Sequence, residues 1–233
     1  MKRAVATNER DESGQAAKTV ADAIYANLRR DLLNGKWPPG SPLRSAALRL
    51  AYGVGISPLR EALTRLVGDR LVTVEGQRGF RVAPVSLSEL QDVMRLRADL
   101  EAMALRAAIE RGDAAWEQAI CTSFEALAEA PAPGGDPEAW EARHAAFHRA
   151  LVGACGSPWL QHFRGVLEDQ SIRYRRLRAR ADTESGIRRD NLREHQDLMT
   201  AVLARDAAAA EALMRAHLGR TATMAAEAAG LKP

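Results

Sequence analysis

Residues 52–63 read YGVGISPLREAL, and this stretch decides the fold of the first third of the chain. Two glycines turn the chain, and Ser57 is then expected to cap a helix whose first residue is Pro58. The helix predicted over residues 57–68 has apolar residues at helical spacing, namely Leu59, Leu63 and Leu66. This pattern predicts a helix that packs through a leucine stripe and leaves charged residues on its other face.

Elements on both sides of this helix complete a small α/β module. Apolar spacing predicts two earlier helices, over residues 19–34 and about 45–52. Strands are expected at 71–74 and 80–82, with a hairpin turn at 76–79. This order is typical of a winged helix-turn-helix, whose second motif helix enters the DNA major groove through its N-terminal residues. Here those residues are Ser57, Leu59 and Arg60.

These residues resemble the GntR family of bacterial repressors. The resemblance is carried by the run SPLREAL at 57–63 and the Gly-Phe-Arg-Val wing at 79–82, together with Leu43-Arg44, Arg65-Leu66 and Leu71-Val72. It implies DNA contacts by a set of residues in the motif and the wing: Arg44, Ser57, Pro58, Arg60, Gln77 and Arg78. Many members carry arginine where this chain has Ile56, so base specificity is expected to differ. Each arginine alone could be an ordinary solvent-facing charge, but the ordered combination of turn, stripe and wing favours DNA binding.

Beyond residue 84 the sequence predicts only helices. Ser86 and Glu89 have the spacing of a capping box. The expected helices span about 87–111, 113–130, 137–154, 158–181, 187–204 and 207–229. The predicted fold class is therefore mainly α, with an N-terminal winged helix-turn-helix and a C-terminal all-α helical bundle. The expected domain plan is a disordered tail at 1–17, a DNA-binding domain at 18–83, a linker at 84–86 and a ligand-binding domain at 87–230.

The second part of the chain contains histidines whose spacing indicates a metal site. His144 and His148 are four residues apart, so they lie on one helix face. His195 and His217 follow on two later helices, and a helical bundle can bring all four together around one divalent ion. His162 has no partner at such spacing and is expected to be a surface or hydrogen-bonded residue.

This part resembles the helical effector domain, of FCD type, in the FadR branch of the same family. In that branch an Asp or Asn usually stands where this chain has His144, followed by the other three histidines. Four nitrogen ligands suit zinc, nickel or copper more than magnesium or calcium, and zinc or nickel is expected. The resemblance also implies that Arg97 faces the pocket and binds effector, although a surface helix charge is an equal alternative. The basic run at 173–180 is expected to form a solvated face, although one of its arginines could point inward.

A closer resemblance within the family concerns the effector, a small mono- or dicarboxylate. The residues around the histidines, with Cys155-Gly156-Ser157 and residues 201–206 and 213–218, are similar to those of repressors of glutarate utilisation. This implies a five-carbon dicarboxylate, glutarate or 2-hydroxyglutarate, as inducer.

An enzyme is not expected. A metalloprotease helix needs a glutamate beside the first histidine as general base, and Ala145 stands there. Two alternatives stay open: a metal-dependent enzyme acting on a small carboxylate, and a regulator whose metal only stabilises the bundle.

The net charge of +3 permits nucleic acid binding without requiring it. With two cysteines and no long apolar run, the sequence predicts a cytoplasmic protein with no membrane segment. A homodimer is expected on a palindromic operator in double-stranded DNA.

Overall fold

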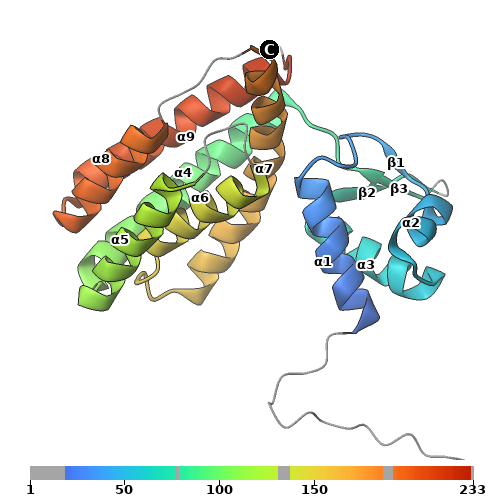
Figure 1. Cartoon of the computed structure of the whole chain (residues 1–233), viewed down its shortest axis with the longest axis horizontal. Coiled ribbons are helices and arrows are strands. Elements are labelled where there is room, and N and C mark those ends of the chain that lie inside the picture. The colour runs from blue at the N-terminus through green and yellow to red at the C-terminus, as the bar shows by residue number, and fades with distance from the viewer. Residues whose placement is uncertain (1–18, 77–78, 131–136, 186–190, 232–233) are drawn as a thin grey trace, which may run out of the picture. The chain divides into compact units, whose positions relative to one another are not determined.

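The computed structural model describes residues 19–76, 79–130, 137–185 and 191–231, and the chain divides into two compact units. One unit contains the described residues up to Leu32 together with Gly40–Ala83. The other contains Leu33–Pro39 and the chain from Pro84 onward. The described elements are mainly helices, with a small sheet in the first unit, which confirms the predicted fold class (Figure 1).

The first unit is a winged helix-turn-helix. Its helices are α1 (Val20–Leu33), α2 (Ser45–Tyr52) and α3 (Ile56–Gly68), and its strands are β1 (Pro42–Leu43), β2 (Val72–Val74) and β3 (Phe80–Val82). The strands are antiparallel in the order β1-β3-β2. The unit's core consists of buried aliphatic residues on the helices and the sheet, among them Ile24, Leu28, Leu48, Leu59, Leu63, Leu66, Leu71 and Val82. Sequence reasoning missed β1, because two residues are too short for an alternating pattern.

The start of α3 differs from the prediction. The helix begins at Ile56, and its N-cap is Gly55, which makes no side-chain capping bond. Ser57 and Pro58 therefore lie inside the first turn, and Ser57 is not the cap. Pro58 is tolerated there because the first four N–H groups of a helix have no intrahelical partner. Gly53 ends α2 with φ +64°, so the turn between the two helices needs a residue that adopts the left-handed region easily.

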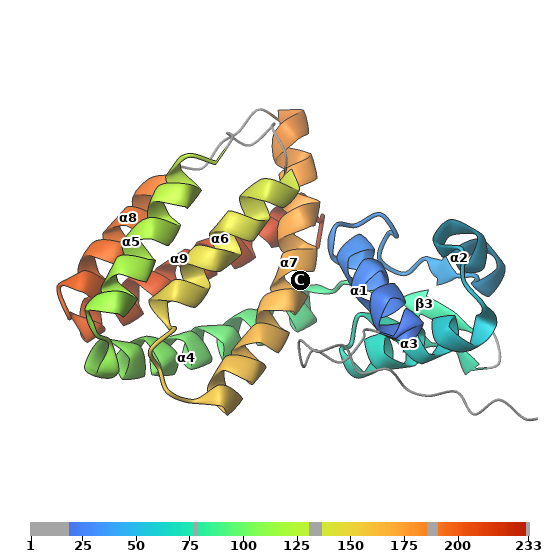
Figure 2. The ribbon, with the colours of Figure 1, turned by 60° about the horizontal axis from the view of Figure 1, so that its bottom comes forward.

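The second unit is built entirely of helices within its described residues (Figures 1 and 2). They are α4 (Leu87–Arg111), α5 (Ala114–Ala128), α6 (Pro137–Leu151), α7 (Pro158–Ser185), α8 (Asn191–Leu203) and α9 (Ala207–Ala228). Helix α4 packs against α7 and α9, α5 packs against α6 and α8, and α9 also contacts α7 and α8. The buried core between them includes Leu105, Ile120, Phe147, Leu151, Val202 and Met214.

Caps fix several helix ends in this unit. The Ser86 hydroxyl accepts from the backbone N–H of Glu89 at 3.1 Å, as the capping box predicts. The carboxylate of Glu89, however, accepts from the Tyr174 hydroxyl at 2.7 Å, so the start of α4 is tied to α7 instead. Asp206 caps α9 through the backbone N–H of Ala209. None of the described helices is both long enough and apolar enough to cross a bilayer.

Candidate functional site

The predicted histidines come together in the interior of the second unit. His144 and His148 lie on α6, His195 on α8 and His217 on α9, and all four side chains are buried. One ring nitrogen from each can be chosen so that all four lie within 4.8 Å of one another. The imidazoles of three helices thus converge on one point. His162 is exposed and lies beside Trp159 and Phe163, outside this group.

Local sequence patterns explain why the imidazoles point inward. On α6 the buried Phe147 and Leu151 are next to or one turn from His148. On α8 the buried Leu198 and Val202 follow His195 at helical spacing and put it on the same apolar face. On α9 the buried Met214 and Leu218 flank His217 in the same way. Each histidine is therefore carried into the core by the apolar stripe of its own helix.

A hydrogen bond orients the ring of His217. The Nδ1 atom of His217 is 2.9 Å from Oε2 of Glu194, which leaves Nε2 of His217 for the centre of the cluster. Arg220 holds the other carboxylate oxygen of Glu194 at 2.9 Å. A carboxylate on the outer nitrogen of a histidine is the usual second layer of a metal site, because it fixes the ring and raises its basicity. Sequence reasoning missed Glu194, whose only signal is its position beside His195.

Two histidines of the cluster are neutral and can therefore act as ligands of a cation. Burial lowers the pKa of His144 and of His148 well below 6.5, and the neighbouring histidines and arginines lower both further. Both rings are therefore neutral at pH 7 and offer lone pairs. The Nδ1 atoms of His144 and His148 have no hydrogen-bond partner among the described residues. Orphaned polar atoms in a buried site indicate a missing partner such as an ion or water.

The geometry fits a divalent ion with nitrogen ligands. The Nε2 atoms of His148 and His195 are 3.2 Å apart. Two imidazole nitrogens on one tetrahedral zinc are roughly 3.3 Å apart, given Zn–N distances of about 2.0–2.1 Å. Other pairs among the four ligand nitrogens are up to 4.8 Å apart. Small changes of the histidine rotamers would bring these nitrogens to the same distance around an ion. The donor set could thus hold a metal.

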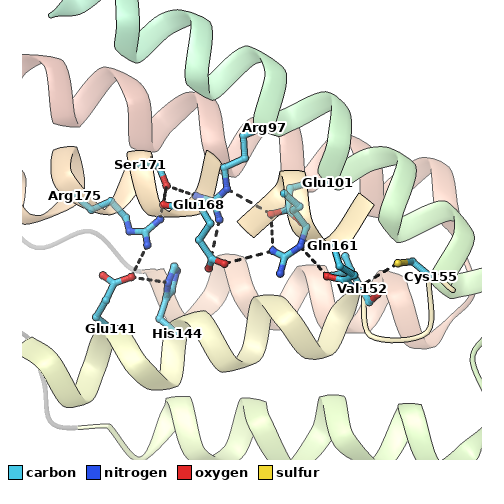
Figure 3. A network of polar contacts seen from close by, with 11 residues as sticks. Arg97, Glu101, Glu141, His144, Val152, Cys155, Gln161, Glu168, Ser171 and Arg175 are labelled. Atoms are coloured by element: carbon cyan, nitrogen blue, oxygen red, sulfur yellow. Dashed lines mark hydrogen bonds and ion pairs between the residues drawn. The ribbon is translucent and has the colours of Figure 1, made fainter. Parts of the chain in front are cut away.

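A buried network of charges lies beside the histidines (Figure 3). Arg97 on α4 donates to the Ser171 hydroxyl at 2.6 Å and to Glu101 at 3.4 Å. Arg164 on α7 donates to the same carboxylate oxygen of Glu101 at 3.0 Å. Glu168 lies 3.9 Å from Arg97 and 3.7 Å from Arg164. Arg97 is therefore buried near the cluster, where its charge contributes to the lowered pKa of His148.

Arg175 connects this network to the histidines. Its guanidinium pairs with Glu141 and donates to Ser171 at 3.2 Å, and Glu141 Oε1 is 3.9 Å from His144 Nδ1. The expectation that the run at 173–180 forms a solvated face is wrong for Arg173 and Arg175, which lie inside the protein. A signal existed in the sequence, since Arg164, Glu168, Ser171 and Arg175 recur at spacings of four, three and four along one face of α7.

The residues predicted to contact DNA lie in the first unit. Arg44, Ser57 and Arg60 are exposed, Pro58 is half-buried, and Arg44 is the residue just before α2. Leu59 is fully buried, so its expected place at the DNA surface is wrong; it belongs to the leucine stripe of α3. Gln77 and Arg78 lie outside the described residues.

Two protein-family models match the chain. The model for bacterial regulatory proteins of the gntR family matches residues 20–82, and the FCD domain model matches residues 92–220. The HTH-type transcriptional repressor GlaR of Escherichia coli is 41% identical over 198 residues, covering 83% of this chain and 90% of GlaR. An uncharacterized HTH-type regulator, BphR of Paraburkholderia xenovorans, is 36% identical over 206 residues, covering 86% and 83%.

Solved structures show the same fold. McbR/YncC of E. coli superposes with a TM-score of 0.73 at 22% identity, covering 90% of this chain and 98% of that one. A GntR regulator from Rhodococcus sp. RHA1 gives 0.72 at 20% identity, covering 91% and 99%. The matched families and these relatives are regulators of transcription, in agreement with the prediction that the chain is not an enzyme.

Proposed function

The chain belongs to the GntR family of bacterial regulatory proteins and carries an FCD domain, and from this premise we propose that it is a ligand-controlled repressor. In this proposal the winged helix-turn-helix binds an operator, and a small carboxylic acid bound at a metal site in the FCD domain releases it. The observation that carries the proposal is the buried set of four histidines beside arginines with unpartnered donor atoms. The relative GlaR, named as a repressor, supports the sign of regulation.

DNA binding is proposed for α3 and the residues around it. The exposed Ser57 and Arg60 near the start of α3 would face the major groove, with Pro58 beside them and Arg44 on the phosphate backbone. The free N–H groups at the start of α3, which no side chain caps, would also suit a phosphate. Gln77 and Arg78 of the wing are proposed as further contacts. A homodimer would place two such helices on a palindromic operator in the cytoplasm.

The metal is proposed to be zinc or nickel, held by His144, His148, His195 and His217. Neutral imidazoles are ligands that both ions prefer, and a site without carboxylate ligands is unsuited to magnesium or calcium. When bound, the ion would supply a positive charge that attracts a carboxylate oxygen of the effector. Glu194 would keep His217 in the ligating orientation.

The effector is proposed to be a small carboxylate that also contacts Arg97. The Nη2 atom of Arg97 is buried and has no hydrogen-bond partner in the described part of the chain. A carboxylate would satisfy it with a charge-assisted bond. The similarity to repressors of glutarate utilisation makes glutarate and 2-hydroxyglutarate the first candidates. The acid would release DNA by its differential affinity for the two states of the regulator.

Operator binding by the metal-loaded full chain, measured against a panel of mono- and dicarboxylates, tests this proposal. We expect glutarate or 2-hydroxyglutarate to lower operator affinity in a saturable way. If no acid in the panel changes the affinity, the sensor function is wrong. A metal that only stabilises the bundle would show a different result, in which chelation lowers the melting temperature but leaves the response to acid intact.

A further inference from the structure

We propose that Arg175 and Arg97 together bind the second carboxylate of a dicarboxylate effector, and that Glu141 occupies Arg175 in the ligand-free chain and competes with the effector. The inference rests on the proposed function, since it takes the first carboxylate to be at the metal. It adds a specificity-determining residue, Arg175, and an internal competitor, Glu141.

The two arginines converge from different helices on one oxygen atom. Arg97 Nη1 on α4 donates to the Ser171 hydroxyl at 2.6 Å, and Arg175 Nη1 on α7 donates to the same oxygen at 3.2 Å (Figure 3). The Ser171 hydroxyl itself donates to the backbone carbonyl of Glu168 at 2.7 Å. One small oxygen-bearing group can therefore lie within reach of both guanidinium groups, which is the arrangement that a carboxylate needs.

Each of the two guanidinium groups has a nitrogen that makes no hydrogen bond within the described residues. These nitrogens are Arg97 Nη2 and Arg175 Nε, and Arg97 Nη2 has only a long ion-pair contact of 3.9 Å with Glu168 Oε1. The side chains are only 1% and 10% exposed, so water has little access to either. A buried charged donor without a partner costs free energy, and an incoming carboxylate removes that cost. These two donors are therefore available for a stronger hydrogen bond to an incoming carboxylate.

A protein carboxylate already connects the arginine to the histidine cluster. Glu141 lies on α6 one turn before His144; it pairs with Arg175, and its Oε1 is 3.9 Å from His144 Nδ1. A dicarboxylate anchored at the metal would make the same connection with its far carboxylate. Glu141 therefore stands in for the ligand, and its negative charge competes with the effector for Arg175.

Charge balance favours a dianion over a monoanion. Within the described network the charges of Arg97, Arg164 and Arg175 cancel those of Glu101, Glu141 and Glu168. Histidine binds a metal in its neutral form, so a divalent ion held by the four histidines adds two positive charges to a buried site. A dicarboxylate balances both, whereas a monocarboxylate leaves one uncompensated charge away from water, which is unfavourable.

The test compares glutarate with pentanoate, which has the same chain length and one carboxylate. Calorimetry on the metal-loaded full chain should show a preference for glutarate. Arg175→Ala should reduce glutarate affinity about tenfold or more, through loss of a charged hydrogen-bond donor, and leave pentanoate affinity unchanged. Glu141→Gln should increase glutarate affinity, because it removes the competing charge and keeps the side-chain shape. An ion pair with a purely structural role would not produce these opposite signs.

Controls separate binding from folding. Arg106→Ala removes an exposed arginine paired with Glu211 and should bind both acids as the wild type does. The double variant Glu141→Gln/Arg175→Ala leaves no buried carboxylate without its arginine, and it should also lose the preference for glutarate. The inference is overturned if Arg175→Ala keeps the wild-type ratio of glutarate to pentanoate affinity, or if Glu141→Gln weakens glutarate binding. If the wild type binds neither acid, the proposed function fails together with the inference.

Discussion

His144 and His148 are the pair on which the proposed metal site depends. They lie one helical turn apart on α6, and both are buried with neutral rings. Replacing both by alanine removes half of the nitrogen ligands, so we expect the purified chain to lose its bound zinc or nickel. Metal content per chain, measured by inductively coupled plasma mass spectrometry, checks this. His162→Ala, which changes an exposed histidine outside the cluster, should keep full metal content. A double variant that retains the metal would contradict the site.

Glu194 would act on the proposed metal through His217. Its carboxylate is 2.9 Å from the outer nitrogen of that ring, and Arg220 holds it in place. Glu194→Gln keeps the shape but loses the charge that orients and polarises the imidazole. We expect metal affinity to fall by roughly 10–100-fold, as for other carboxylates behind ligating histidines. Competition with a chelator of known affinity measures the change. An unchanged affinity would mean that Glu194 serves only the packing of α8 on α9.

At the scale of elements, α3 is the helix proposed to read DNA. Arg60 is exposed near its start, while the leucines on its opposite side are buried. Arg60→Ala should weaken operator binding by about 1–3 kcal/mol if the side chain contacts a base edge. If it contacts a phosphate, binding should weaken evenly across sequences, with a salt slope smaller by about one. Fluorescence anisotropy at several salt concentrations distinguishes the two. The matched control, Arg30→Ala on α1, changes an exposed arginine outside the motif, and equal losses in both variants would contradict the assignment.

Helix α1 is tied to α3 by an ion pair that gives the first unit an acid-sensitive contact. Arg65 donates to Asp22 at 2.6 Å, and Thr19 donates to the same carboxylate group. The bond from Arg65, then those from Thr19, lower the pKa of Asp22 from 3.8 to about 2. The unfolded chain therefore binds more protons between these values, so the contribution is complete above pH 3.8 and is lost as the pH falls through about 2.

Asp22→Asn should consequently destabilise the chain at pH 5 and lose that difference toward pH 2. Urea unfolding midpoints of the wild type and the variant at a series of pH values measure it. The effect is expected to be small, because the carboxylate is solvent-accessible and screened. Asp92→Asn, an exposed ion-pair partner of Arg95 in the other unit, is the control. A midpoint difference that stays constant from pH 5 to pH 2 would contradict the role of Asp22.

The features that the sequence predicted well are those set by local spacing. The i, i+4 pair of His144 and His148, and the cap at Ser86, depend on residues within one turn of each other. The features that it missed depend on distant partners. Arg175 and Glu141 are 34 residues apart in sequence, and β1 exists only because Leu43 pairs with Phe80. The sequence alone predicts a solvated face for a charged run such as residues 173–180, because it does not show which helices cover the run.

At the scale of the whole molecule, the proposed DNA-binding and effector-binding sites lie in two different units. The first unit has the fold of a DNA-binding module, and the second contains the histidines and the buried arginines. The two family matches follow the same division, since the gntR match covers residues 20–82 and the FCD match covers residues 92–220. The proposed effector would couple the two by binding one state of the regulator more tightly than the other.

The measurement that tests the central claim most directly is the metal dependence of effector binding. Glutarate is titrated calorimetrically into the full chain loaded with zinc, and into the same preparation after chelation and return to the same buffer. Circular dichroism confirms that both samples are folded. We expect saturable binding to the loaded chain, and binding to the stripped chain weakened beyond detection. Equal binding of glutarate to both samples would contradict a sensor in which the four histidines hold the metal that the effector contacts.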